Sequence, residues 1–149
     1  MTGGIHDIAL HPQRIIPTEG GAVLHAMKAG DNTFCGFGEA YVSEITGGSI
    51  RAWKRHQRMT LNLVVVQGSV RFVIHDDRPG SPTQGRFHEV LLSRDKNHAR
   101  LTVPPLLWLG FQGIAQPTSM LLNIANLEHD PEEVDREPMN HFRFDWHAT

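Results

Sequence analysis

Glycine and proline recur along the whole sequence and divide it into short apolar segments. The 14 glycines and 9 prolines are spread from end to end rather than gathered in linkers. This spacing is typical of all-β domains, whose short strands alternate with turns. Residues 60–66, "TLNLVVV", are apolar enough for a strand buried on both faces, and residues 69–75, "SVRFVIH", alternate as a half-buried strand does. Gln67-Gly68 between them is a two-residue turn signal.

We expect roughly eight to ten short strands in all. The candidates are residues 39–45, 49–55, 60–66, 69–75, 88–93, 99–103, 107–114 and 119–127, while residues 22–28 suit either a strand or one helical turn. Such a set of strands predicts a closed barrel or a double-sheet jelly roll. A chain of 149 residues can bury an ordinary core, so we expect a single domain over residues 1–149.

One short C-terminal helix is expected over residues 130–138. Asp130 can cap it, Pro131 suits the first helical position, and the two glutamates that follow favour the positive end of the helix dipole.

A loop is expected over residues 76–87, which are rich in Asp, Gly and Pro. Local hydrogen bonds and an ion pair among Asp76, Asp77 and Arg78 are expected to hold this loop.

Charge and cysteine content exclude several classes of partner. The net charge is -2 and no long basic run occurs, so nucleic acid is not an expected partner. No apolar run reaches the roughly 18 residues of a membrane span, and the N-terminal residues do not resemble a signal peptide. Cys35 is the single cysteine, so no internal disulfide forms and a cytoplasmic location is the default expectation. A lone cysteine of this kind is typical of a small core residue.

The segment "AWKRH", residues 52–56, is the most informative candidate site. Lys54 and His56 are two residues apart, so on a strand their side chains leave the same face. Two ionisable groups on the inner face of a jelly roll are costly to desolvate unless they have a function, whereas an outward-facing pair needs none. Periodicity alone leaves the choice open. Trp53 has the opposite parity and is expected in the core or in a dimer interface.

Four segments carry a family resemblance when they are taken in order. They are residues 37–78, which contain "SIRAWKRHQRM" and a strand ending in "DDR"; residues 76–93, with "DDRPGSPTQG"; residues 101–114, "LTVPPLLWLGFQGI"; and residues 130–146, "DPEEVDREPMNHFRFDW". Over nearly its whole length the chain resembles the cupin superfamily. Within that superfamily it resembles the dTDP-4-dehydrorhamnose 3,5-epimerase family of sugar-nucleotide enzymes.

The resemblance implies a fold, a chemistry and an assembly. The fold is a double-stranded β-helix, the cupin jelly roll, and the family forms homodimers by exchanging or adding strands. The reaction removes and returns protons at C3 and C5 of a nucleotide-linked 4-keto-6-deoxy sugar, with no metal and no cofactor. Such chemistry needs a base, an acid on the opposite face and a group that stabilises the enolate oxygen.

Site residues follow from the resemblance position by position. The family's base histidine in R-G-x-H corresponds to Lys54, and the Asp that pairs with it in the late D-P corresponds to Glu137. A Lys54–Glu137 ion pair is therefore expected. Arg51 matches the arginine of R-G-x-H, and it can face the same pocket as Lys54 only if a β-bulge separates them.

Other family positions have changed identity here. The tyrosine acid corresponds to Asn123 and a lysine that aids enolate formation corresponds to Asn62, while the arginine that holds the diphosphate corresponds to Gly20. An amide does not titrate in this range, so Asn123 is expected to bind substrate rather than protonate it. Tyr41, the single tyrosine, is a further candidate for the substrate pocket.

A cupin-type metal site is not expected. Metal-binding cupins carry H-x-H, a later Glu and a distant His, and the corresponding residues here are Lys54, His56, Leu61 and Leu109. A divalent metal needs about three good donors and only His56 remains. His56 also matches the second His of H-x-H in related sugar-nucleotide ketoisomerases, and an ordinary imidazole pKa suits a base.

Two functions remain open at this point. In the first, the chain is an epimerase or ketoisomerase of polysaccharide or antibiotic sugar synthesis. Its catalytic residues would be His56, Lys54 and Glu137, and its substrate contacts would be Arg51, Asn62, Asn123 and Tyr41. In the second, it is a sugar-nucleotide-binding or partner-binding cupin that has lost catalysis, which the changed family positions favour. A metal-dependent dioxygenase ranks third.

Overall fold

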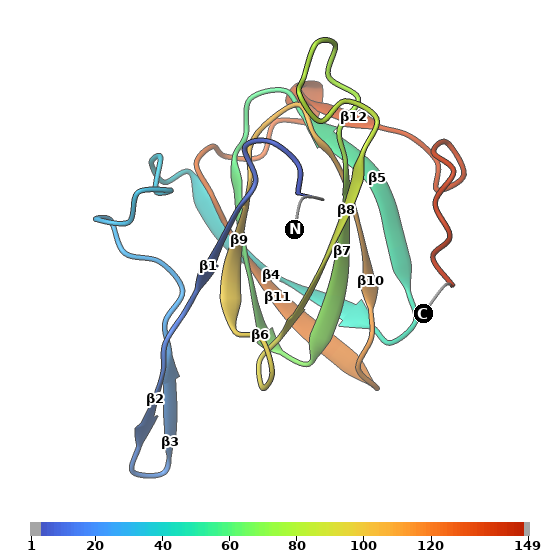
Figure 1. Cartoon of the computed structure of the whole chain (residues 1–149). Coiled ribbons are helices and arrows are strands. Elements are labelled where there is room, and N and C mark those ends of the chain that lie inside the picture. Colours follow the sequence, from blue (N-terminus) through green and yellow to red (C-terminus); the bar gives the residue numbers. More distant parts are fainter. Residues whose placement is uncertain (1–3, 148–149) are drawn as a thin grey trace.

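The computed structural model describes residues 4–147 as two five-stranded antiparallel sheets packed face to face, with a separate two-stranded hairpin (Figure 1). The first sheet has the order β1-β9-β6-β11-β4 and the second the order β12-β5-β10-β7-β8, while β2 pairs with β3. The strands are β1 (Ala9–Pro12), β2 (Ile15–Thr18), β3 (Gly21–Leu24), β4 (Glu39–Thr46), β5 (Ile50–His56), β6 (Leu61–Gln67), β7 (Ser69–His75), β8 (Phe87–Ser93), β9 (Ala99–Val103), β10 (Trp108–Gly113), β11 (Thr118–Ala125) and β12 (Val134–Arg136). This architecture confirms the predicted jelly roll.

The turn at Gln67-Gly68 lies where the sequence predicts it, but it does not close a hairpin. β6 pairs with β9 and β11 in one sheet, and β7 pairs with β10 and β8 in the other, so the turn carries the chain from sheet to sheet. Gly68 has φ +81, and a Cβ there would lie 2.3 Å from Oγ of Ser119. Both the backbone conformation and the close neighbour require glycine at this corner.

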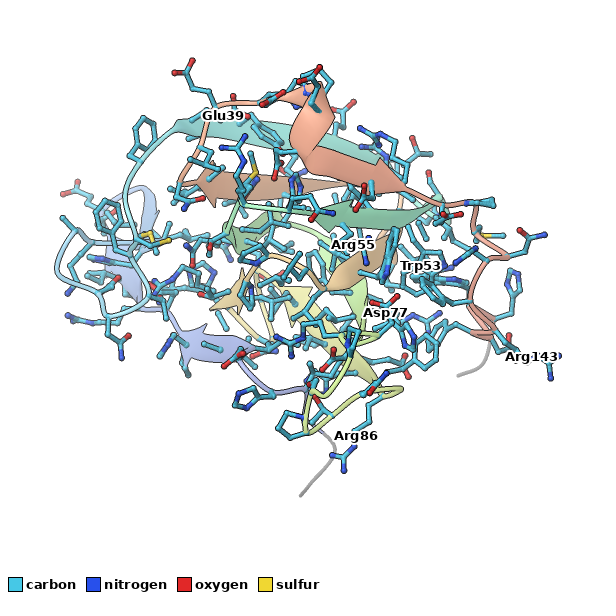
Figure 2. The ribbon with its side chains drawn as sticks, turned by 90° about the horizontal axis from the view of Figure 1, so that it is seen from above. Glu39, Trp53, Arg55, Asp77, Arg86 and Arg143 are labelled. Atoms are coloured by element: carbon cyan, nitrogen blue, oxygen red, sulfur yellow. The ribbon has the colours of Figure 1, made fainter. Side chains whose placement is uncertain are left out.

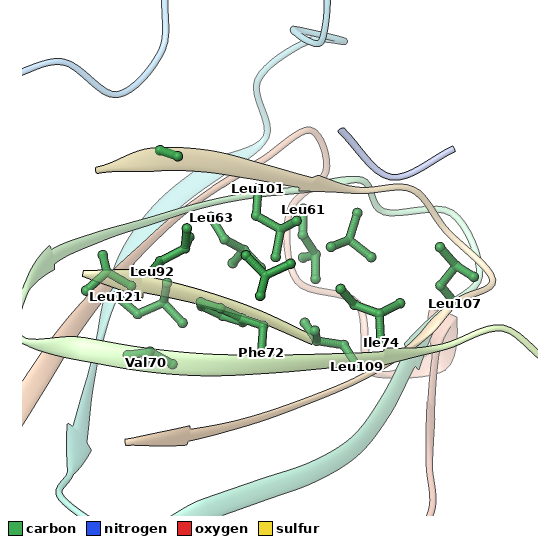
Figure 3. Packing of buried hydrophobic residues seen from close by; sticks show 14 of the residues in the cluster. Leu61, Leu63, Val70, Phe72, Ile74, Leu92, Leu101, Leu107, Leu109 and Leu121 are labelled. Carbon is green, nitrogen blue, oxygen red and sulfur yellow. The ribbon is translucent and has the colours of Figure 1, made fainter. Parts of the chain in front are cut away.

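The main core lies in the space between the two sheets. Leu63 and Leu121 face it from the first sheet, and Phe72, Ile74 and Leu109 face it from the second (Figure 3). Burying each such side chain contributes about 1.5–3 kcal/mol relative to exposure. These residues alternate along their strands with residues of the outer faces, which is why each sheet presents a continuous apolar inner surface.

A second, aromatic cluster covers the outer face of the β5-β10-β7 sheet. Trp53, Trp108 and Trp146 are buried in it, and the half-buried Phe142 packs against them, with its ring centroid 5.4 Å from that of Trp53. The C-terminal segment 138–147 supplies part of this cluster, so it lies across the sheet rather than extending from it. The prediction that Trp53 packs into a core is confirmed.

The C-terminal helix is a single 3-10 turn, Pro131–Glu133. Its predicted cap is present, since Oδ1 of Asp130 accepts a hydrogen bond from the backbone N–H of Glu132 at 3.0 Å. Helix does not continue to residue 138 because the next residues form β12 on the free edge of β5, pairing Arg136 with Lys54. Tertiary strand pairing here outweighs the local helix signals.

The N-terminal region contains three strands, of which only β3 falls in a segment that the sequence indicates. β1 and β2 each include a proline, which weakens their strand signal. β1 adds to the edge of β9, and the β2–β3 hairpin projects away from the barrel (Figure 1). Cys35 lies exposed after this hairpin, so the expectation of a core cysteine is wrong.

Candidate active site

A cavity of about 450 Å³ lies within the barrel, in the space between the two sheets. Strands β4, β5, β6, β10, β11 and β12 all contribute to its wall. The lining residues are Tyr41, Ser43, Arg51, Ala52, Trp53, Lys54, His56, Leu61, Leu63, Leu109, Phe111, Leu121, Asn123, Arg136 and Glu137. The wall thus combines apolar side chains with a small set of ionisable ones, as ligand sites commonly do.

A β-bulge in β5 brings Arg51 and Lys54 to this one cavity. Opposite β10, Lys54 pairs with Leu109 and Arg51 pairs with Phe111, so Ala52 and Trp53 together face the single residue Gly110. The extra residue reverses the side-chain parity, and both cations line the cavity. The bulge that the sequence required is therefore present.

His56 forms a buried pair with Glu133. Its Nδ1 hydrogen-bonds Oε1 of Glu133, whose other oxygen accepts the backbone N–H groups of Arg58 at 2.9 Å and Met59 at 3.1 Å. Nε2 of His56 is buried and has no hydrogen-bond partner among residues 4–147. The ring therefore lines the cavity with one nitrogen held and the other unused.

The surroundings set the protonation states of this pair. Burial acts to raise the pKa of Glu133, but the hydrogen bonds from His56, Arg58 and Met59 outweigh it and lower the pKa below its usual value. Burial lowers the pKa of His56, against the opposing effect of Glu133. At neutral pH the ring is accordingly neutral, donates Nδ1–H to a carboxylate and keeps its lone pair on Nε2. This is the state of a general base.

Lys54 has a different environment from the one that the resemblance implies. No ion pair joins it to Glu137, whose carboxylate instead lies 3.2 Å from Nδ1 of His141. The predicted Lys54–Glu137 pair is thus wrong, although both residues line the cavity. The pairing fails because β12 places Arg136, not Glu137, opposite Lys54.

Of the predicted substrate contacts, Asn62 lies away from the cavity. On β6 its neighbours Leu61 and Leu63 face inward, so strand alternation directs Asn62 to the other face of the sheet. There its Oδ1 accepts a hydrogen bond from Oγ1 of Thr102 at 2.6 Å, and its Nδ2 donates to the carbonyl of Thr33. The assignment of Asn62 to substrate binding is therefore corrected.

Asn123 and Tyr41 do lie together in the wall. Nδ2 of Asn123 donates to the hydroxyl of Tyr41 at 3.1 Å, and the buried Oδ1 of Asn123 has no partner among residues 4–147. The pair presents an amide oxygen and a phenol on β11 and β4, across the barrel interior from the sheet that carries His56.

All four positions that correspond to metal ligands in other cupins line this cavity. They are Lys54, His56, Leu61 and Leu109. Two are leucines, which cannot coordinate a metal. Within residues 4–147, no cluster of three or more His, Cys, Asp or Glu side chains is placed to hold a metal ion.

Two residues of the site escaped prediction. The sequence predicts that Glu133 lies in the first turn of a helix, where it favours the helix dipole, yet its side chain turns inward to His56. Arg136 was given no role, yet it lines the cavity beside Lys54. The sequence contains no pattern that indicates either role, because both depend on where β12 pairs.

In the described part of the chain, no helix is long and apolar enough to cross a membrane.

The fold and the cavity together define a cupin-type jelly roll with a buried His–Glu pair at the cavity in its barrel. A family model described as dTDP-4-dehydrorhamnose 3,5-epimerase matches residues 36–146. The chain belongs to the dTDP-4-dehydrorhamnose 3,5-epimerase family.

Individual relatives agree with this assignment. The crystal structure of a dTDP sugar isomerase from Desulfovibrio desulfuricans G20 is 35% identical, with a TM-score of 0.93 over 97% of this chain and 94% of that one. The probable low-salt glycan biosynthesis epimerase Agl13 of Haloferax volcanii is 27% identical over 97% of this chain and 96% of its own. The dTDP-4-dehydrorhamnose 3,5-epimerase of Bacillus anthracis, solved with TDP and PPi bound, shares the fold at 24% identity and a TM-score of 0.77, over 90% of this chain and 80% of that one.

Proposed function

We propose that this protein is an epimerase or isomerase that acts on a nucleotide-linked 4-keto-6-deoxy sugar by moving protons beside the ketone. The observation that carries the proposal is the His56–Glu133 pair in the wall of the cavity, with a neutral imidazole whose Nε2 is unengaged. Family membership supports the substrate class. No cofactor is required, since the hydrogens next to a ketone are acidic enough for general-base catalysis.

Several side chains in and beside the cavity have roles in this scheme. His56 removes the proton next to the carbonyl, and Glu133 holds the ring in the tautomer that does so. Arg51 and Arg136 are the fixed cations of the wall and bind the diphosphate. Asn123 and Tyr41 contact the sugar from the opposite sheet, with the phenol as a proton donor. Glu137 contributes to the wall beside Trp53, whose backbone it hydrogen-bonds in both directions.

Proton exchange in heavy water tests this function. The protein is incubated with dTDP-4-keto-6-deoxyglucose in D2O, and the C3 and C5 proton signals are followed by NMR. We expect loss of at least one of these signals at a rate proportional to protein concentration. Inversion at C3 or C5 with the ketone still at C4 would identify an epimerase, and a shift of the ketone from C4 to C3 would identify a ketoisomerase. Binding of the sugar nucleotide without any exchange would instead identify a binding protein that has lost catalysis, which the asparagine at the tyrosine position favours.

We infer that the protein forms a homodimer. The β2–β3 hairpin projects from the barrel and exposes Ile15 and Val23, and β4 is an unpaired sheet edge that exposes Tyr41 and Val42. Exposed apolar side chains on a projecting hairpin and an open edge are typical of strand-mediated association. Sedimentation equilibrium should give twice the chain mass of 16.7 kDa. A Val23→Asp variant should shift the equilibrium towards monomer, and a monomeric parent protein would contradict the inference.

The proposed class of substrate also suggests the kind of pathway and the cellular compartment in which the protein works. The similarity to Agl13 supports a place in glycan or polysaccharide biosynthesis. The single cysteine is exposed and unpaired, which is compatible with a reducing compartment, and we propose a cytoplasmic location. Cell fractionation tests the location: the protein should be recovered with cytoplasmic markers, and its recovery in another fraction would contradict the proposal.

A further inference from the structure

One lysine of this chain differs from the others in where it lies. The sequence has three lysines, of which Lys28 and Lys96 are exposed in turns outside the barrel. Lys54 instead lines the cavity from β5 of the second sheet, which lies between β10 and the edge strand β12. It points to the same side as His56, two residues further along β5.

The charges around Lys54 give it no anionic partner. On the adjacent strand Arg136 lies directly opposite it, and on the other side β10 offers only Leu109. The two carboxylates nearby are engaged elsewhere, Glu133 by His56 and Glu137 by His141. No ion pair joins Lys54 to a carboxylate of residues 4–147.

These surroundings favour the neutral amine. Burial lowers the pKa of Lys54 from its usual 10.5, the positive charge of Arg136 lowers it further, and that of Arg51 acts in the same direction against Glu133. The apolar wall from Leu61, Leu63 and Leu109 offers an ammonium ion little solvation. A lysine that is desolvated beside other cations is the usual form of an amine nucleophile.

We propose that Lys54 is a nucleophile that condenses with the 4-keto group of the sugar to form an imine, through which the neighbouring proton is exchanged. The inference rests on the proposed function, since it needs a ketone substrate in this cavity. It assigns Lys54 a covalent role in place of the base that the family carries at the same position.

The step balances without any oxidant or reductant. Nζ of Lys54 attacks C4, a C–N bond forms, and the carbonyl oxygen leaves as water after it has taken up two protons, one from the attacking nitrogen and one from solvent. Nε2 of His56 then removes the proton at C3 or C5, and the electron pair of that C–H bond moves into the protonated C=N bond to give an enamine. Reprotonation and hydrolysis of the imine return the ketone and the free lysine.

An imine accounts for the arrangement better than a third binding cation does. Arg51 and Arg136 already supply two permanent charges to the same wall. A protonated imine also accepts the electron pair itself, so it replaces the group that would otherwise stabilise an enolate oxygen. His56 lies within the same strand and face, where it can carry the protons that both steps require.

Reductive trapping tests this assignment. The protein is mixed with dTDP-4-keto-6-deoxyglucose and sodium cyanoborohydride, and intact-mass and peptide mass spectrometry follow the product. We expect a gain equal to the mass of the sugar nucleotide less one oxygen atom, located on Lys54. Lys54→Arg, which supplies a permanent cation but no amine nucleophile, should abolish the adduct and lower the rate of proton exchange at least about a hundredfold. Lys96→Arg, a matched change at an exposed site, should alter neither.

The outcomes separate this inference from the proposed function. Exchange without an adduct at Lys54 would overturn the imine and leave the function intact. An adduct at Lys54 without exchange would support the nucleophile and remove the epimerase function. Absence of adduct, exchange and binding together would overturn both. An adduct that forms equally on Lys28 or Lys96 would also overturn the assignment, because it would show ordinary surface reactivity.

Discussion

Replacement of His56 by asparagine is expected to slow proton exchange at C3 and C5 by about 10²- to 10⁴-fold, the usual contribution of a positioned general base. Asparagine can still donate a hydrogen bond towards Glu133, so the buried carboxylate keeps a partner and the fold is preserved. Affinity for dTDP should remain near that of the parent, since the diphosphate contacts lie elsewhere in the wall. Isothermal titration and NMR exchange measure the two quantities separately.

The control for this variant is His129→Asn, because His129 is exposed and does not line the cavity. The pH profile provides a second readout. Burial lowers the pKa of His56, and the base form is the neutral one, so the exchange rate should rise with pH and level off with a midpoint below about 6.5. Glu133→Gln removes a charge that favours the protonated ring, which should move this midpoint lower still. Full activity of the His56 variant, or a midpoint above 6.5, would contradict the role of His56.

Replacement of Asp76 by alanine is expected to destabilise the protein by about 3–5 kcal/mol, as loss of one member of a buried ion pair does. The Asp76 carboxylate is fully buried and accepts hydrogen bonds from Nε and Nη2 of Arg78, both at 2.9 Å, and from the hydroxyls of Ser81 and Thr83, both at 2.6 Å. The predicted local ion pair is therefore confirmed for Asp76 and Arg78, whereas Asp77 accepts a hydrogen bond from the indole N–H of Trp108 and pairs with Arg55 outside the loop. Loss of the Asp76 carboxylate leaves Arg78 and two hydroxyls without their central acceptor.

Urea unfolding at pH 7 measures this difference, and Asp95→Ala is the matched control. Asp95 pairs with Arg94 at the surface, where an ion pair contributes only about 0–1 kcal/mol. Although burial opposes it, the hydrogen bonds from Arg78, Ser81 and Thr83 hold the pKa of Asp76 far below its usual value. Its contribution is therefore present above the unfolded pKa near 4 and is lost progressively as the pH falls below it. The gap between parent and Asp76→Ala should shrink below about pH 4, and a gap that stays constant would contradict this account.

The strands of the barrel were predictable because their signals are local. Alternation in residues 69–75 and the double-sided apolar run of residues 60–66 reflect burial against neighbours that any jelly roll supplies. The bulge beside Lys54 was also within reach, since Arg51 and Lys54 can share a pocket only through one. Which face of each strand points into the barrel remained open, because alternation separates the residues into two faces without showing which of the two is the inner one.

The partners of the site residues could not be predicted in the same way. Glu133 and Glu137 lie within one short segment, and which of them meets His56 or Lys54 depends on the register of β12 against β5. Register is decided by tertiary packing and by a turn of only three residues, neither of which leaves a pattern in the sequence. The prediction for Asn62 depended on a similar choice, because neighbouring residues on a strand point to opposite faces, and Asn62 points away from the cavity that Leu61 and Leu63 line.

The bulge at Ala52 and Trp53 also joins two regions that would otherwise be independent. Trp53 turns outward into the aromatic cluster, and it lies on the same side of the barrel as Arg55 and Asp77 (Figure 2). Trp53 is also one of the residues that line the cavity, and its indole N–H donates to the carbonyl of Met139 at 3.1 Å. All three tryptophans of the chain belong to this one cluster. The intrinsic fluorescence of the protein therefore originates next to the cavity, so that the molecule carries its own optical probe of whatever enters the barrel.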